Sequence, residues 1–110
     1  MNIETRELKH VSVVVVSGRV DSATAPDLQK ALQDLFDSEH KQLVLDLKDV
    51  DYMSSAGLRV LVSMQKAAKK NGGTLRLAQL SARVTEVLEL AGLAPVFDIY
   101  PDVVEAVGAF

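Results

Sequence analysis

Two stretches near the N-terminus have the residue pattern of β-strands. Residues 3–8 alternate apolar and polar side chains, which predicts an edge strand. Residues 11–17 are dense in valine, and because β-branched side chains suit the buried surface of a sheet, this stretch predicts a central strand. Only Lys9 and His10 separate the two stretches, so we expect a hairpin, with Gly18 ending its second strand.

Three later stretches repeat apolar residues at intervals of three and four, the pattern of a helix with one face against a core. Serine and threonine suit the first position of a helix and glycine suits its end. The first helix is expected to begin at Thr24, with Asp27 as an acidic capping-box partner. The second is expected to begin at Ser54 or Ser55 and to end at Gly72, and the third to begin at Ser81 and end at Gly92. The expected inward faces are Ala25, Leu28, Leu32, Leu35 and Phe36; Val60, Leu61, Met64, Ala67 and Ala68; and Val84, Val87, Leu88 and Ala91.

Further strand-like segments alternate with these helices. They span residues 43–47, 74–78 and 96–100, and a short terminal helix that contains Val103, Val104 and Val107 is expected after them. Two strands followed by alternating helix and strand indicate an α/β fold, with a mostly parallel sheet that begins with an antiparallel pair. No repeat or linker divides the sequence, so we expect residues 1–110 to form a single domain.

The composition of the chain excludes several kinds of chemistry. Its 110 residues include no cysteine and only two histidines, which rules out thiolate chemistry and leaves little material for a metal site. The net charge of −3 disfavours a nucleic-acid partner, which would require a basic face. The apolar run at 13–16 is too short to span a membrane, and the polar N-terminal residues do not resemble a secretion signal. We therefore expect a cytoplasmic protein without a cofactor, a bound metal or membrane insertion.

Residues 51–58 carry the most distinctive polar pattern in the chain. They join the strand at 43–47 to the next helix, on the side of a parallel sheet where functional residues gather. On local pattern alone, Ser54 caps the helix and Gly57 allows close packing, and this structural role is the commoner one. A nucleophilic Ser55 is disfavoured, because the segment lacks the G-x-S-x-G elbow and both histidines flank other strands. A phosphate-binding loop is excluded, since the segment has one glycine and no lysine.

Motifs at four places in the chain follow one another in a recognisable order. They are residues 44–47 with 50–61, the G-x-[LIV]-D turn at 18–21, Asn71-Gly72-Gly73, and residues 90–93. Together they resemble the STAS domains, which occur in bacterial anti-sigma factor antagonists and in sulphate transporters. The resemblance covers nearly the whole chain. It implies the STAS fold, a four- to five-stranded mixed β-sheet with helices packed mainly on one side.

The resemblance also implies a regulatory site. In the family pattern D-S-[ST/A]-G-L, the phosphorylated residue lies two positions before the glycine, which places it at Ser55. In family members that switch partners, the unphosphorylated domain binds an anti-sigma factor that is also a serine kinase of the GHKL type. Phosphorylation releases this partner, and a phosphatase of the PP2C type restores binding. The usual aspartate before the acceptor is Ser54 here, which makes Ser54 a candidate second acceptor.

The expected docking surface combines the loops that follow two neighbouring strands. Both loops lie beyond the same strand ends, so their side chains should share one edge of the sheet. The surface residues are Asp21, Ser22, Ala23, Thr24, Ser54, Ser55, Ala56, Gly57, Leu58 and Arg59. We interpret the chain as a binding module without catalytic residues, an anti-sigma factor antagonist. The alternative is an accessory subunit that binds the ATPase of a lipid or other ABC transporter.

Overall fold

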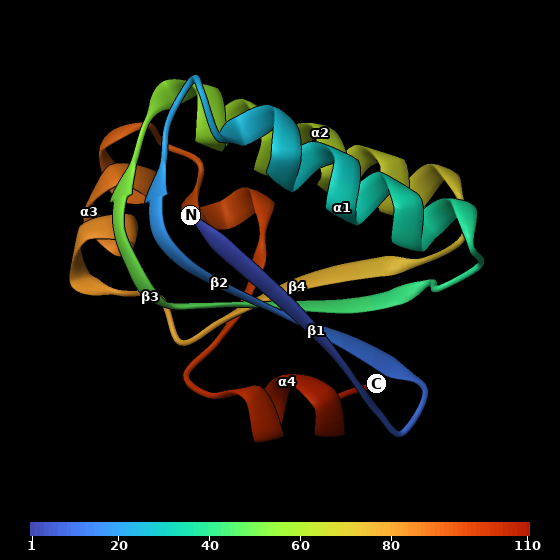
Figure 1. Cartoon of the computed structure of the whole chain (residues 1–110). Coiled ribbons are helices and arrows are strands. Elements are labelled where there is room, and N and C mark those ends of the chain that lie inside the picture. Colours follow the sequence, from blue (N-terminus) through green and yellow to red (C-terminus); the bar gives the residue numbers. More distant parts are fainter.

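The computed structural model describes the whole chain, residues 1–110, as a five-stranded sheet with helices on both faces (Figure 1). The elements are β1 (Asn2–Leu8), β2 (Val11–Val20), α1 (Ala25–Asp37), β3 (Gln42–Met53), α2 (Ser55–Lys70), β4 (Thr74–Ala78), α3 (Ala82–Leu90), the 3-10 turn η1 (Ala94–Val96), β5 (Asp98–Tyr100) and α4 (Val103–Gly108). The strands lie side by side in chain order. The first pair, β1 and β2, is antiparallel and all other neighbours are parallel, which confirms the expected mixed α/β sheet.

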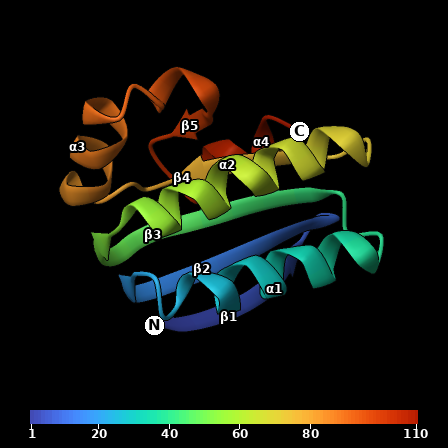
Figure 2. The same ribbon diagram turned by 90° about the horizontal axis from the view of Figure 1, so that it is seen from above.

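Three of the four helices cover one face of the sheet. Helices α1, α2 and α3 lie on this face, and α4 lies on the other (Figure 1). Seen from above, α1 and α2 lie side by side and run along the direction of the strands (Figure 2). The expected arrangement, with helices mainly on one side, is confirmed. None of the helices is long and apolar enough to cross a lipid bilayer.

Side chains of β2 are buried on both faces of the sheet. Val14 and Val16 belong to the large core beneath α1, α2 and α3, while Val11 and Val13 pack in a smaller cluster with Ala106 of α4. A strand that is covered on both faces has no side that needs polar residues. This two-sided burial explains the valine run of the central strand.

Two strands are longer than the sequence pattern predicts. Strand β2 does not end at Gly18 but continues to Val20, and β3 extends beyond the expected 43–47 to Met53. Gly18 adopts a φ of +89° where the register between the two strands shifts, so β2 bends there without ending. The extension of β3 is rich in charged residues, and its lack of apolar alternation hid it in the sequence.

The C-terminal part differs from the prediction in the length of one strand and in the exposure of Ala91. Strand β5 covers only Asp98–Tyr100, because η1 precedes it. Ala91, which was expected to face inward, is exposed, because α3 ends at Leu90. The buried residue of α4 is Ala106, and its carbonyl accepts a hydrogen bond of 2.9 Å from Arg76 Nη1 of β4. This contact between residues far apart in the chain sets which face of α4 meets the sheet.

Candidate functional site

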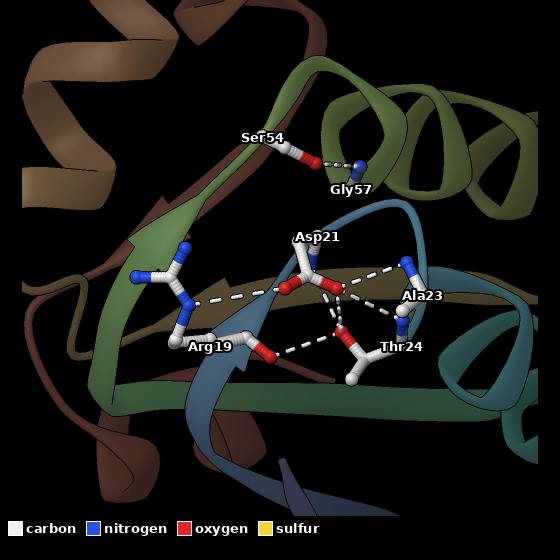
Figure 3. Close-up of polar contacts among 6 residues, drawn as sticks. All are labelled: Arg19, Asp21, Ala23, Thr24, Ser54 and Gly57. Carbon is white, nitrogen blue, oxygen red and sulfur yellow. Dashed lines mark hydrogen bonds and ion pairs between the residues drawn. The ribbon is translucent and has the colours of Figure 1, made fainter.

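The carboxyl ends of β2 and β3 form the edge of the sheet where the two loops of interest lie. Strand β3 ends at Met53, and α2 begins at Ser55. The backbone N–H of Ser54 donates a hydrogen bond of 2.9 Å to the carbonyl of Val20, the last residue of β2. This bond ties the start of α2 to the loop between β2 and α1, so the two segments lie together (Figure 3).

Ser54 is the N-cap residue of α2. Its backbone is extended, with φ −86° and ψ 172°, and its Oγ accepts a hydrogen bond of 3.3 Å from the Gly57 N–H (Figure 3). A cap of this kind satisfies one of the free N–H groups in the first helical turn. Ser54 is half-buried and its hydroxyl is engaged, which confirms the cap that the sequence predicts.

Ser55 differs from Ser54 in both exposure and bonding. It is the first residue of α2, it is exposed to solvent, and its hydroxyl makes no hydrogen bond within the protein. A hydroxyl that is bonded within a cap is held in one orientation, whereas an unbonded one is free to rotate. Of the two neighbouring serines, Ser55 is therefore the one with a free hydroxyl.

The loop after β2 is held by the carboxylate of Asp21. Its Oδ1 accepts hydrogen bonds from the backbone N–H groups of Ala23, at 2.9 Å, and Thr24, at 3.1 Å (Figure 3). The Thr24 hydroxyl does not cap α1, because it accepts from the Asp21 N–H at 2.9 Å and donates to the Arg19 carbonyl at 3.0 Å. The predicted threonine cap is thus wrong in its chemistry. Asp21, and not Thr24 with Asp27, satisfies the N–H groups that lead into α1.

The same hydrogen bonds lower the pKa of Asp21 below its ordinary value of 3.8. The Thr24 N–H has the largest effect, and burial opposes it by raising the pKa. The Ala23 N–H, the Thr24 hydroxyl and the positive charge of Arg19 lower the pKa further. Arg19 Nε lies 3.8 Å from Asp21 Oδ2, and its guanidinium also covers the ring of Tyr52, 4.2 Å from the ring centre. The Asp21 carboxylate is therefore a charged anchor for this loop.

Replacing Asp21 with asparagine is expected to destabilise the protein at neutral pH. Because the folded pKa lies below the unfolded one, the carboxylate contributes stability above the unfolded value and loses it as the pH falls through the folded pKa. The difference in unfolding free energy between wild type and D21N should therefore shrink in acid. Urea unfolding of both proteins at about pH 7 and about pH 3 measures this difference.

Asp27→Asn is the matched control for that prediction. It also removes one negative charge, from the first turn of α1, but it breaks no hydrogen bond of the loop. It should therefore lower the free energy of unfolding less than D21N does at neutral pH. A D21N effect that stayed constant down to about pH 3 would contradict the role assigned to the carboxylate.

Gly57 and Leu58 set how closely α2 approaches the sheet. Both are buried, and a Cβ atom at Gly57 would collide with Met53 Sδ and lie 2.8 Å from Val20 Cγ1. These two residues of the predicted docking surface therefore offer little exposed area to a partner, and their role is to hold α2 against the sheet. The other predicted surface residues are exposed or half-buried: Asp21, Ser22, Ala23, Thr24, Ser54, Ser55, Ala56 and Arg59.

Two shallow grooves flank α2 beside Ser55. The first, of about 570 Å³, is lined by Ser55, Leu58, Arg59, Val62, Ser63, Lys66 and Leu93. The second, of about 400 Å³, has residues of both α1 and α2 along it and is lined by Ser22, Ala25, Pro26, Gln29, Ala56, Arg59, Val60 and Ser63. Arg59 and Ser63 line both grooves, so they form the ridge between them.

The sequence interpretation missed part of this surface. Ser63 and Lys66 lie on α2 beyond the motif, and helical spacing could have found Ser63, because residues four apart such as Ser55, Arg59 and Ser63 share one face. Leu93 follows α3, and no local pattern connects it with α2. Only the path of the chain after α3 brings it to the groove.

A second polar cluster lies at the opposite end of the sheet. Ser12 Oγ lies 2.7 Å from Glu7 Oε1 and 2.9 Å from His40 Nδ1, and the same ring nitrogen lies 3.0 Å from that carboxylate oxygen. A serine–histidine–acid triad places the serine and the carboxylate on different ring nitrogens, whereas both contact Nδ1 here. Ser12 is also only 1% exposed, so the cluster joins β1, β2 and the connection before β3. No group of three His, Asp or Glu residues gathers to hold a metal ion.

Comparison with known proteins identifies the family of this chain and several relatives. The STAS domain family matches residues 2–106 of the chain. The anti-sigma-B factor antagonist of Bacillus subtilis (strain 168) is 35% identical over 99 residues, which cover 90% of this chain and 90% of the relative.

Solved structures agree with this match. An anti-sigma factor antagonist from Mycobacterium paratuberculosis is 29% identical, with a TM-score of 0.89 over 98% of this chain and 92% of that one. The anti-sigma factor antagonist SpoIIAA in its unphosphorylated form is 16% identical, with a TM-score of 0.81 over 98% and 95% of the two chains. Its phosphorylated form is 14% identical, with a TM-score of 0.75 over 98% of each chain. Both forms of SpoIIAA share the fold described above.

Proposed function

This chain belongs to the STAS domain family, and we propose that it is an anti-sigma factor antagonist whose binding is switched by phosphorylation of Ser55. The observation that carries the proposal is the free, exposed hydroxyl of Ser55 at the start of α2, beside the groove of about 570 Å³. A relative of 35% identity that is named an anti-sigma-B factor antagonist supports the choice of partner.

The partner is an anti-sigma factor that is also a serine kinase of the GHKL type, and it docks on the edge that carries Ser55. The kinase transfers the γ-phosphoryl group of ATP to Ser55 Oγ and releases ADP, while the hydroxyl loses its proton. A PP2C-type phosphatase hydrolyses the phosphate ester and restores the hydroxyl. The chain itself acts as a binding protein in this cycle, and neither DNA nor RNA contacts it.

Phosphorylation adds about −1.5 to −2 charge at neutral pH. At the start of α2 this charge faces free backbone N–H groups and the positive end of the helix dipole, so the domain tolerates it. The fold of SpoIIAA in both its forms supports this point. The cost falls on the docked partner, which would have to bury a dianion or meet it with acidic groups. A few kcal/mol of such cost changes affinity by orders of magnitude.

Ser55 is a better acceptor than Ser54 in this proposal. The Ser54 Oγ accepts a hydrogen bond from the Gly57 N–H and Ser54 is half-buried, so a phosphate group there would have to rearrange the cap of α2. Modification of Ser55 breaks no hydrogen bond within the protein. We therefore assign Ser54 the role of a cap in place of the aspartate that the family pattern usually has there.

The test is the affinity of the cognate anti-sigma factor for wild type, Ser55→Ala and Ser55→Asp, measured by isothermal titration calorimetry. We expect S55A to bind like wild type, because the docked face keeps its neutral character. We expect S55D to bind at least about tenfold more weakly, a loss of about 1.4 kcal/mol. Aspartate carries less charge than phosphoserine, so the phosphorylated protein should bind more weakly still.

Ser38→Asp is the control, because Ser38 is an exposed serine at the far end of α1. The substitution adds the same charge as S55D, but away from the site. It should not change the affinity. Equal affinities for wild type, S55A and S55D would contradict the switch. Recovery of a transporter ATPase in place of a kinase, in a pull-down with the wild-type chain, would favour the transporter alternative.

A further inference from the structure

One cation lies close to Ser55 along α2. Arg59 follows Ser55 by four residues, is exposed, and takes part in no ion pair. Side chains four residues apart on a helix are neighbours, with Cβ atoms about 5–6 Å apart. Both side chains also line the same groove. A phosphate group on Ser55 Oγ would therefore lie within reach of the Arg59 guanidinium.

The other nearby cations are less suited to such a contact. Lys66 is the second charged residue of the groove, but it lies about 16 Å from Ser55 along the helix axis. Arg19, on the neighbouring strand, already contacts the Asp21 carboxylate and the ring of Tyr52. No acidic residue lines the groove to compete for Arg59.

We propose that Arg59 is the intramolecular partner of the phosphate group on Ser55. The inference rests on the proposed modification of Ser55. The planar guanidinium presents paired N–H donors that match two phosphate oxygens, and such charge-assisted hydrogen bonds are stronger than neutral ones. Arg59 acts here as a positioning residue that holds the phosphate along α2.

This contact changes the docking surface in a second way. Arg59 forms the ridge between the two grooves, so it presents a positive charge to a partner while Ser55 is unmodified. Once the phosphate group pairs with the guanidinium, the positive charge of Arg59 is no longer available to an acidic group of the partner. Phosphorylation thus adds a bulky anion at Ser55 and removes a free cation at Arg59.

The test uses the full chain with phosphoserine incorporated at position 55 during translation, so that neither a kinase nor a partner is needed. The second pKa of phosphoserine, ordinarily about 6, is followed by phosphorus NMR at low salt. A nearby guanidinium favours the dianion and lowers this pKa. We expect Arg59→Gln to raise the measured pKa by about 0.3–0.5, and Arg59→Lys to raise it less.

Lys70→Gln is the matched control, because it removes the same charge about 22 Å away at the other end of α2. It should leave the phosphoserine pKa at the wild-type value, and thermal unfolding checks that both variants fold. Equal pKa values for the R59Q and K70Q proteins would overturn the proposal. The proposed Ser55 switch is tested separately, by the S55D titration. If that switch is wrong, S55D binds the partner with the affinity of wild type.

Discussion

Replacing Gly57 with alanine is expected to lower the free energy of unfolding by about 1–3 kcal/mol. In an open helical position the same substitution stabilises by about 1 kcal/mol, because alanine is the better helix former. The sign reverses here because the added Cβ would collide with Met53 Sδ and lie 2.8 Å from Val20 Cγ1. The Met53 side chain is long enough to shift, but Val20 is β-branched and fully buried, so α2 must move away from β2.

That movement reaches the candidate site. The Val20 carbonyl accepts the Ser54 N–H, and the Ser54 Oγ accepts the Gly57 N–H, so a displaced Gly57 disturbs the cap directly before Ser55. We therefore expect G57A to weaken binding of the anti-sigma factor by roughly tenfold as well. Urea unfolding measures the stability, and isothermal titration calorimetry measures the affinity.

Two further variants control this prediction. Gly108→Ala adds a methyl group in α4, where no atom lies within 4 Å of it, and should be neutral or stabilising. Met53→Ala in the G57A background frees space for the new Cβ, so the double variant should lose less stability than the sum of the single variants. Strict additivity, or wild-type stability of G57A, would show that the collision does not govern this position.

Replacing Gly73 with alanine is expected to lower the free energy of unfolding still more, by about 3 kcal/mol. The added Cβ would collide with the carbonyl oxygen of Lys41 and lie 3.1 Å from its carbonyl carbon. This carbonyl cannot turn away freely, because it accepts a hydrogen bond of 2.7 Å from the Thr74 N–H. Relief of the collision therefore separates β3 from β4 at the start of their pairing, between Gln42 and Thr74.

The neighbouring Gly72 provides the comparison for that measurement. No atom lies within 4 Å of a Cβ there, but its φ of +72° is unfavourable for alanine, so Gly72→Ala should cost about 1–2 kcal/mol. Urea unfolding of both variants separates the collision from backbone strain. If G73A proved no less stable than G72A, the close approach to Lys41 would not be a constraint.

Much of the fold was predictable because its signals are local. The 74–78 strand was predicted at its observed ends, since apolar and polar side chains alternate between two turns. Ser54 and Ser81 were predicted as caps, and each hydroxyl accepts an N–H three residues ahead. A cap depends on residues within one helical turn, so the sequence contains what is needed to recognise it.

The errors occurred where the folded backbone offers a bonding partner other than the one that the residue pattern suggests. The Thr24 hydroxyl is a good cap by its position, but it bonds to the Arg19 carbonyl and the Asp21 N–H instead. The extension of β3 is rich in charged residues and resembles a loop in the sequence, yet it pairs with β2 up to Val20 and Met53. Backbone pairing between strands does not depend on side-chain hydrophobicity, so periodicity cannot reveal it.

By itself, the sequence determined that this chain forms an α/β domain with Ser54 and Ser55 at the start of a helix. The tertiary structure decided which hydroxyl is engaged, how α2 sits against β2, and which residues form the grooves beside Ser55. Arg59 lies four residues after Ser55 in any helix, but only the packing of α1, α2 and Leu93 shows that it forms a ridge between two grooves. The reason is physical, because periodicity reports the faces of single elements and a surface arises from how those elements pack together.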